Sequence, residues 1–274
     1  MTFTIDDHVV KAAYSGNCTK STMQIPGVDG TYEALQFHIH TSSEHTIDGA
    51  FFGAELHVVH KQTDADRYAV YGMMIEATND KNHEVFEAFL DGWTSIADDT
   101  VEACTTSVNS GGTTNANTSF TLTIDNSTAI TQQARIGSQR KLSEDVFNVY
   151  DMVPKGSSFY HYDGGLTTPP CSEVVWWNLA DTPVSISVLQ YTRLTQLVLE
   201  YRNTETCELA TVASPSGSTS RPTQALNGRI VKRICPTAFV EEVKTGSDTS
   251  TASVVSIVSA LATAGAAAFA IQVF

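Results

Sequence analysis

Positive charge is scarce in this chain of 274 residues, which has 16 Lys and Arg residues against 30 Asp and Glu residues and a formal net charge of −14. A protein that binds nucleic acid needs a basic surface that neutralises phosphates. We therefore expect no nucleic-acid partner, and we interpret the acidity as a property that keeps the protein soluble. The length and the hydrophobic content of 42% fit one sizeable domain.

Targeting signals and long apolar runs are also scarce. The first residues, MTFTIDDHVV, lack the basic and apolar regions of a secretory signal peptide. The exception is the segment 254–274, which carries no charge and follows a polar linker at 244–253. We expect this hydrophobic tail to be a GPI-attachment signal, with Gly246 or Ser247 as the attachment residue. A C-terminal membrane span and a soluble tail are the alternatives.

Two apolar segments carry histidines in a strand-like alternation, QFHIH at 36–40 and ELHVVH at 55–60. Residues two apart share a face of a strand, so His38 and His40 point the same way, and His57 points away from His60. If the two strands are neighbours, three imidazoles converge on one point.

Zinc explains such a convergence. Three imidazole ligands leave the fourth tetrahedral position open to water, as in catalytic zinc sites. Gln36 and Glu55 share faces with these histidines and stand where hydrogen-bond partners of ligating histidines are needed. Burying so polar a face is costly unless its groups are paired or bound to metal.

Longer stretches around these segments resemble a known family. Residues 36–60, QFHIHTSSEHTIDGAFFGAELHVVH, are similar to the zinc-binding core of the alpha-class carbonic anhydrases, and residues 159–177, FYHYDGGLTTPPCSEVVWW, are similar to the second signature of that family. The resemblance covers roughly residues 1–235. It implies a mixed α/β (α+β) fold with a central, largely antiparallel twisted β-sheet, peripheral helices and zinc at the base of a conical cavity. We expect helical patches at Asn82–Trp93 and Leu189–Tyr201.

The resemblance also implies the reversible hydration of CO2 to bicarbonate and a proton, with one Zn²⁺ per chain. His38, His40 and His57 would be the zinc ligands. Thr167 matches the threonine that accepts a hydrogen bond from the attacking water and donates its own to a carboxylate, here Glu44.

Further site roles are implied for positions around these residues. The implied substrate-binding residues are Thr168, Val59, Val70, Leu166, Val175 and Trp177. The residues implied to support the ligands are Gln36, Glu55, His45 and Tyr162.

The family's proton-relaying histidine has no obvious equivalent. Residues 1–5 align with a strand at the edge of the cavity, so the chain is expected to begin inside the family domain, with the relaying histidine at or just before Met1. His8 is nearby but does not match that position. We interpret His8, like His83 and His161, as solvated or structural.

The cysteine count is odd. The resemblance implies that Cys171 pairs with a cysteine in an N-terminal segment that this sequence does not contain. The other four cysteines allow three pairings, of which we expect Cys18–Cys104 and Cys207–Cys235. Five reduced thiols in a cytosolic protein are the alternative.

Three N-x-S/T sequons, at Asn17, Asn117 and Asn126, favour a glycoprotein of the secretory pathway, at the cell surface or outside the cell. Two of them lie in a stretch rich in Thr, Ser, Asn and Gly, which indicates an insertion into the family domain at about 97–140. The catalytic domain is expected to span 1–243. The alternative function is a non-catalytic binding or adhesion module at the cell surface, but the three histidines, Thr167 and Glu44 are all present, which favours the enzyme.

Overall fold

The computed structural model describes residues 1–6, 8–14, 20–25, 27–78, 81–109, 148–203, 206–211 and 213–235. Several sequence-based expectations lie outside these residues, namely those for Asn17, Cys18, Asn117, Asn126, the linker at 244–253 and the tail at 254–274.

The described elements follow one another along the chain as strands, one long helix, and strands again. They are β1 (Thr2–Ile5), β2 (Val10–Ala13), β3 (Thr22–Met23), β4 (Tyr32–Thr41), β5 (Ala54–Gln62), β6 (Tyr68–Thr78), α1 (Glu84–Asn109), the 3₁₀ helix η1 (Val149–Met152), β7 (Phe159–Gly164), β8 (Val175–Ala180), β9 (Val184–Ser187), α2 (Val188–Leu199) and β10 (Lys232–Ile234).

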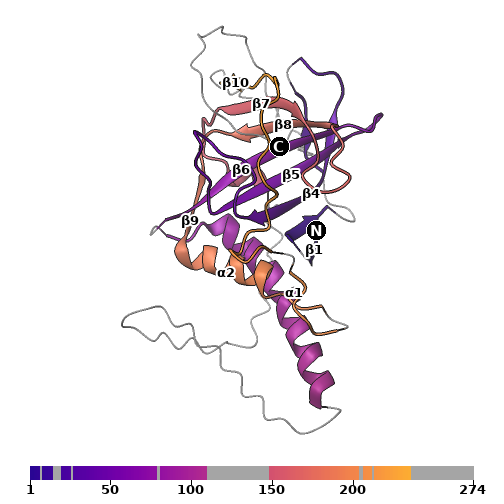
Figure 1. The fold of residues 1–274 in the computed structure, drawn as a ribbon, viewed down its shortest axis with the longest axis vertical. Helices are drawn as coiled ribbons and strands as arrows, with labels where there is room; N and C mark the ends of the chain where they lie inside the picture. The colour runs from indigo at the N-terminus through magenta and orange to yellow at the C-terminus, as the bar shows by residue number, and fades with distance from the viewer. Residues whose placement is uncertain are drawn as a thin grey trace, which may run out of the picture.

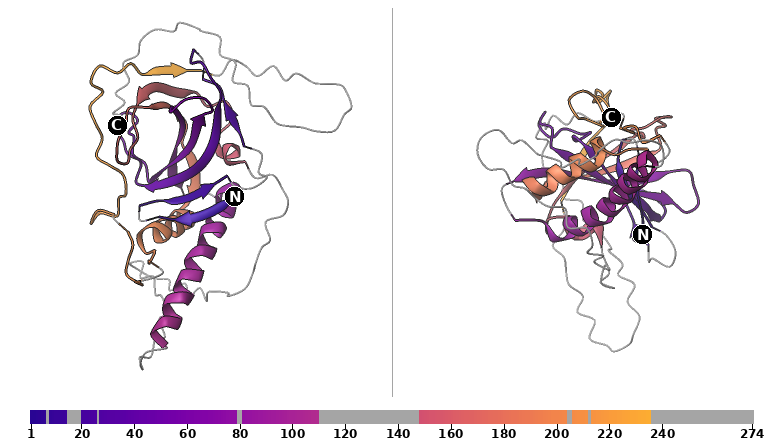
Figure 2. Two further views of the ribbon diagram at one scale, coloured as in Figure 1. Left: turned by 90° about the vertical axis from the view of Figure 1, so that its right-hand side faces the viewer. Right: turned by 90° about the horizontal axis from the view of Figure 1, so that it is seen from below.

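The described strands form one sheet in the order β1-β2-β4-β5-β6-β8-β7-β10, with β3 beside β4 and β9 beside β6. Neighbouring strands run antiparallel, except that β6 pairs in parallel with β8 and with β9. Figure 2 shows how strongly this sheet twists and curves. The expected twisted, largely antiparallel sheet is therefore confirmed, and β1 lies at its edge.

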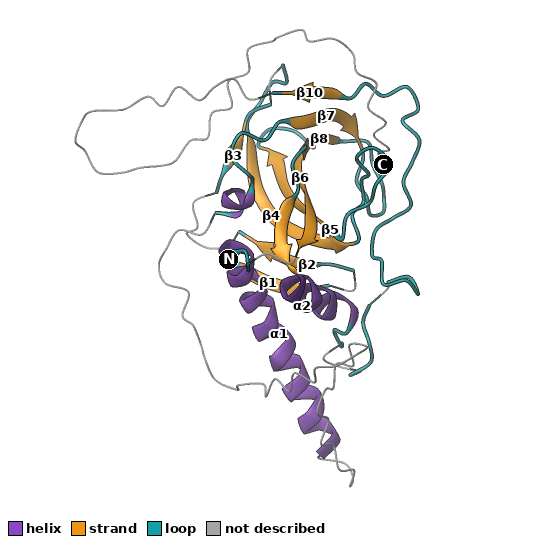
Figure 3. Ribbon diagram, turned by 90° about the vertical axis from the view of Figure 1, so that its left-hand side faces the viewer, coloured by secondary structure: helices purple, strands orange, loops and turns teal. Residues whose placement is uncertain are grey.

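The central strands are buried on both faces, and each face has its own chemistry. One face is apolar: Phe37 on β4 packs against Phe89 of α1, with ring centroids 4.5 Å apart. Trp93 of α1 also packs there, and its indole N–H donates to the Lys11 carbonyl at 2.9 Å. Figure 3 shows α1 and α2 at one end of the sheet, below β1 and β2. The opposite face carries buried polar side chains together with a second apolar cluster around Trp177.

The helix α1 is longer than the sequence predicted. It begins near the expected start but continues past Trp93 to Asn109, so the first part of the expected insertion at 97–140 is helical. No Gly or Pro interrupts residues 94–109. In Figures 1 and 2 the second half of α1 extends away from the sheet. The helix α2 lies close to its expected position and begins with a capping box between Ser187 and Gln190.

The described disulfide joins Cys104 to Cys207, with Cα atoms 5.6 Å apart. The expected pairings Cys18–Cys104 and Cys207–Cys235 are therefore wrong. The physical reason is the length of α1, which carries Cys104 beyond the sheet to the segment that follows α2. Cys171 and Cys235 are exposed free thiols.

The described helices include none that is long and apolar enough to cross a membrane.

Candidate metal centre

Three histidines meet on the face of the sheet opposite α1. His38 on β4 is directly opposite His57 on β5, and His40 follows two residues after His38. The centroids of their rings form a nearly equilateral triangle, with sides of 5.0, 5.1 and 5.1 Å. One nitrogen from each ring lies within 4.8 Å of the other two. The strand alternation read from the sequence thus brings the three imidazoles together.

Hydrogen bonds fix which nitrogens face the centre of this triangle. His38 Nδ1 is 2.9 Å from Gln36 Oε1, and His57 Nε2 is 2.7 Å from Glu55 Oε1. Both oxygens accept, so these ring nitrogens carry the hydrogens when the imidazoles are neutral. The lone pairs of His38 Nε2 and His57 Nδ1 are then left facing each other at 3.3 Å. They repel unless a proton or a metal ion lies between them.

The residues present fit a tetrahedral zinc ion. Two nitrogens at about 2.0–2.1 Å from a tetrahedral zinc are roughly 3.3–3.4 Å apart, which agrees with the 3.3 Å separation of His38 Nε2 and His57 Nδ1. Both ring nitrogens of His40 are buried without a hydrogen-bond partner, as is Glu44 Oε2. Unsatisfied buried polar atoms are rare because each costs about 1–3 kcal/mol. A cation at the triangle would satisfy one of the two ring nitrogens of His40.

Burial keeps two of these imidazoles neutral. It is the largest cause that lowers the pKa of His40 to about 4 and the pKa of His38 well below its usual value. For His57, burial acts in the same direction, but the Glu55 carboxylate outweighs it and raises the pKa. A neutral imidazole has the lone pair that a metal needs.

Glu55 organises the loop that follows β4. Its Oε2 accepts the backbone N–H groups of Glu44 and His45 at 2.9 and 2.8 Å, and its Oε1 is 2.7 Å from His45 Nδ1. His45 Nε2 in turn is 2.6 Å from the Tyr162 hydroxyl. Burial raises the pKa of Glu55, but His45 and His57 overcome that effect and hold it well below its usual value. The carboxylate is therefore ionised and supports His57 from behind.

A glycine, which has no side chain, leaves space for the Glu55 carboxylate. Gly72 on β6 is directly opposite His57. A Cβ atom at Gly72 would lie 2.5 Å from Leu179 Cδ2 and 3.3 Å from Glu55 Oε1. Glycine is thus required where Glu55 passes beneath His57.

Thr167 and Thr168 lie in the loop between β7 and β8, half-buried and exposed respectively. The expected hydrogen bond from Thr167 to Glu44 is not formed among the described contacts, since Glu44 Oε2 has no partner. The other oxygen, Oε1, accepts the backbone N–H of Arg221 at 3.3 Å. Glu44 Oε2 instead lies 3.5 Å from His40 Nε2.

The expected apolar substrate wall is brought together. All five residues belong to one apolar cluster on the histidine side of the sheet. Three are buried in it, namely Val70, Val175 and Trp177, and two are partly buried and pack against it, namely Val59 and Leu166. The Trp177 ring centroid is 4.8 Å from that of His57. An uncharged molecule would therefore find an apolar surface beside the triangle.

His8 lies beside the histidine triangle, a placement that the sequence analysis did not predict. Its ring centroid is 6.2 Å from that of His40. The cause is the register of β2 on β4, which pairs Val10 with Ile39 and brings the turn between β1 and β2 to the histidine triangle. The sequence VKAA at residues 10–13 alternates only over Val10-Lys11-Ala12, which is a weak signal for a strand.

The remaining histidines take structural positions. His60, on the apolar face, bonds to the Ala69 carbonyl at 3.1 Å and to the Tyr150 hydroxyl. His83 Nδ1 accepts the Phe86 N–H near the start of α1 at 3.4 Å. His161 Nδ1 is 2.8 Å from Asn178 Oδ1.

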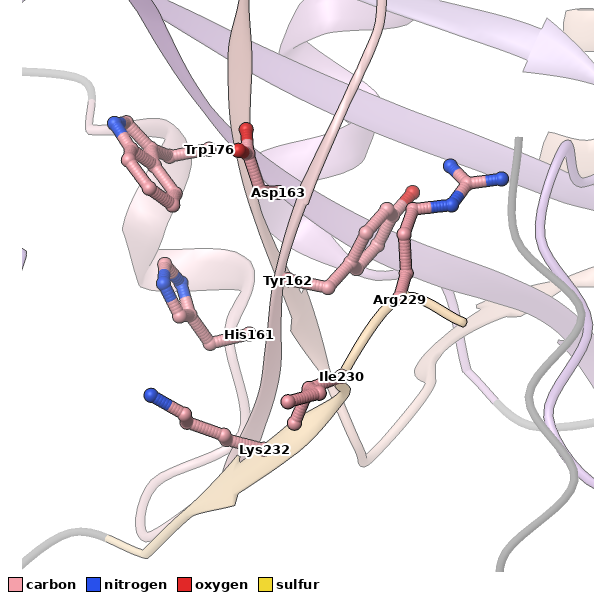
Figure 4. A pocket seen from close by; sticks show the side chains of 7 residues that line it. All are labelled: His161, Tyr162, Asp163, Trp176, Arg229, Ile230 and Lys232. Carbon is pink, nitrogen blue, oxygen red and sulfur yellow. The ribbon is translucent and has the colours of Figure 1, made fainter. Parts of the chain in front are cut away.

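A cavity of about 260 Å³ beside β7 is lined by His161, Tyr162, Asp163, Trp176, Arg229, Ile230 and Lys232. Figure 4 shows that its side chains diverge, with His161 and Lys232 on one side of the strand and Tyr162 and Arg229 on the other. They form no converging constellation comparable with the histidine triangle.

Known proteins are similar to this chain in sequence and in fold. The family model of the eukaryotic-type carbonic anhydrases matches residues 1–113 and 108–235. A carbonic anhydrase of Nostoc sp. is 26% identical over 200 residues, which is 73% of this chain and 53% of the relative. Human carbonic anhydrase 7 is 26% identical over 238 residues, which is 85% of this chain and 76% of that protein.

A solved structure of a hyperthermostable carbonic anhydrase, identified from an active hydrothermal vent chimney, superposes with a TM-score of 0.52 at 24% identity, over 84% of this chain and 74% of that chain. The chain spans about half the length of several curated relatives that it matches. The family model nevertheless matches most of the chain, on a fold that the solved structure shares. On this basis, the chain belongs to the family of eukaryotic-type carbonic anhydrases.

Proposed function

We propose that this protein catalyses the reversible hydration of CO2 to bicarbonate and a proton, with one Zn²⁺ held by His38, His40 and His57. The observation that carries the proposal is the pair of facing ring nitrogens, His38 Nε2 and His57 Nδ1, at 3.3 Å, beside a His40 ring whose nitrogens have no hydrogen-bond partner. When bound there, zinc would act as a Lewis acid that makes water nucleophilic near neutral pH, the chemistry for which carbonic anhydrase is the standard example.

The chain's own residues would hold and orient the reactants. Glu55 and Gln36 fix the ring tautomers of His57 and His38, so that their lone pairs point into the triangle, where the metal would bind. Thr167 would accept a hydrogen bond from the attacking water and donate its own to Glu44 Oε2, which is buried and free to accept. Thr168 would help to hold bicarbonate. The apolar wall around Trp177 would receive CO2 by dispersion and desolvation.

We further propose that His8 carries the proton away from the site. The imidazole of histidine can both accept and donate a proton, which is the chemistry that proton transfer to buffer requires. The placement of its ring 6.2 Å from that of His40 supports this role, with water bridging the remaining gap.

The Cys104–Cys207 disulfide supports a proposal that the protein matures in the secretory pathway and works outside the cytosol. Membrane attachment through the tail, and glycans at the sequons, stay predictions.

The direct test is metal content and CO2 hydration measured on the same purified full-length sample, with and without a sulfonamide inhibitor. One zinc per chain together with sulfonamide-sensitive hydration is the expected result. Stoichiometric zinc without hydration, even with added imidazole buffer, would favour the binding-module alternative.

A further inference from the structure

Lys11 shares the face of the sheet that carries the histidines. It is directly opposite His38 in the β2–β4 ladder, and His38 is directly opposite His57 in the β4–β5 ladder. Directly opposed residues in antiparallel strands point to the same side, with Cβ atoms about 4.5–5.5 Å apart. Lys11, His38 and His57 therefore form one row across β2, β4 and β5.

The position of the lysine is fixed at both ends. Its backbone carbonyl accepts the indole N–H of Trp93 at 2.9 Å. Its ammonium group is 2.6 Å from Asp6 Oδ2, at the start of the turn that carries His8. Both side chains are about one third exposed, at 34% and 37%. The charge is thus held near the metal centre while it remains in contact with solvent.

The lysine ammonium group keeps hydrogen-bond donors that Asp6 does not use. Asp6 takes one of the three ammonium hydrogens, and no other described residue accepts from Lys11.

We propose that Lys11 is a specificity-determining residue that strengthens the binding of small anions, bicarbonate in particular, at the metal centre. The inference rests on the proposed function. The two forms of the substrate differ in charge: CO2 is neutral and gains nothing from the ammonium group, whereas bicarbonate is an anion and is attracted to it. At separations of several ångströms beside solvent, one partly compensated charge changes anion affinity by roughly 3- to 10-fold.

The test is equilibrium binding of thiocyanate to the full-length protein in which cobalt replaces zinc, followed by the visible spectrum at fixed pH and ionic strength. Lys11→Met removes the charge but keeps most of the aliphatic chain. Asp6→Asn removes the compensating charge but keeps a hydrogen-bond acceptor. Lys20→Met is the matched control, because Lys20 pairs with Glu33 at 3.7 Å near the far end of β4.

We expect Lys11→Met to raise the thiocyanate Kd by about 3- to 10-fold. Asp6→Asn should lower it, and Lys20→Met should leave it within about 1.5-fold of the parent, because that charge lies beyond a screening distance of about 8–10 Å. Equal thiocyanate Kd values in the parent and in Lys11→Met, or weaker binding in Asp6→Asn, would overturn the inference and leave the proposed function standing. A parent protein that takes up no cobalt would contradict the proposed function and this inference with it.

Discussion

At His40, both ring nitrogens are buried without a hydrogen-bond partner, although the ring centroid is only 5.0 and 5.1 Å from those of His38 and His57. Such an arrangement is costly in a metal-free protein and is favourable around a cation. That His38 and His40 share one face could be predicted from the sequence, because side chains in a strand alternate with a period of two. The position of His8 could not, since it depends on the register between β2 and β4, which no local pattern specifies.

Substitution of Thr167 tests whether its hydroxyl orients the attacking water. Thr167→Ala should keep stoichiometric zinc but reduce the rate of CO2 hydration by roughly 10²-fold, the effect of losing one preorganised hydrogen bond. Stopped-flow hydration, normalised to bound zinc, measures the change. Thr167→Ser restores a hydroxyl and should recover most of the rate; an alanine variant as fast as the parent would show that Thr167 has no such role.

Substitution of His8 tests whether this residue carries the proton from the site to buffer. His8→Ala should bind zinc normally and lose roughly 10²-fold in rate at low buffer concentration, at the lower end for general acid–base transfer. Imidazole added to the buffer should recover the lost rate, because it replaces the missing side chain. The same replacement at His83, which bonds near the start of α1, serves as the control. A His8→Ala rate that is low but insensitive to imidazole would argue for a structural role instead.

At the scale of elements, η1 is joined to the sheet through a buried histidine. His60 on β5 is inaccessible to solvent and contacts the Tyr150 hydroxyl of η1. The sequence indicated only that His60 points away from His57. Its partner is 90 residues further along the chain, so the pairing could not be read from any local pattern.

The burial of His60 makes stability depend on pH. Burial lowers the pKa of His60 from 6.5 to about 4. Between these values the unfolded chain binds a proton that the folded chain does not, so stability is full above pH 6.5 and falls as the pH falls towards 4. The loss attributable to this group is up to roughly 3 kcal/mol.

Urea unfolding of the metal-free protein at pH 7, 6 and 5 measures this dependence. His60→Gln should be less stable at pH 7 and should lose less stability on acidification than the parent. Identical pH slopes in the two proteins would show that His60 is not the titrating group.

The long helix α1 is tied to the segment after α2 by the Cys104–Cys207 disulfide, which closes a sequence separation of 103 residues. Replacing both cysteines with serine should lower the free energy of unfolding by about 2–4 kcal/mol, mainly by releasing the unfolded chain. Denaturant unfolding in the absence of reductant measures the loss. Cys171→Ser, at an exposed free thiol, is the control and should be neutral. A double variant as stable as the parent would mean that the cross-link adds nothing to the folded state.

At the scale of the whole molecule, the sheet and its largely antiparallel order were predictable, because the resemblance rests on motifs that lie on β4, β5, β7 and β8. The length of α1 and the disulfide were not. Both depend on residues 94–109, whose polar composition was read as part of an insertion although the helix continues through them. Cysteine pairing follows from where α1 ends in space, which the spacing of cysteines in the sequence does not encode.

The central claim is that His38, His40 and His57 hold a zinc ion on which CO2 hydration depends. The most direct measurement returns zinc in known amounts to metal-free parent protein and to His57→Ala, and follows CO2 hydration after each addition. The parent rate should rise in proportion to bound zinc and level off at one ion per chain. His57→Ala should bind zinc weakly and stay at the buffer rate. A parent rate that does not change as zinc binds, or a His57→Ala variant that matches the parent, would contradict the account.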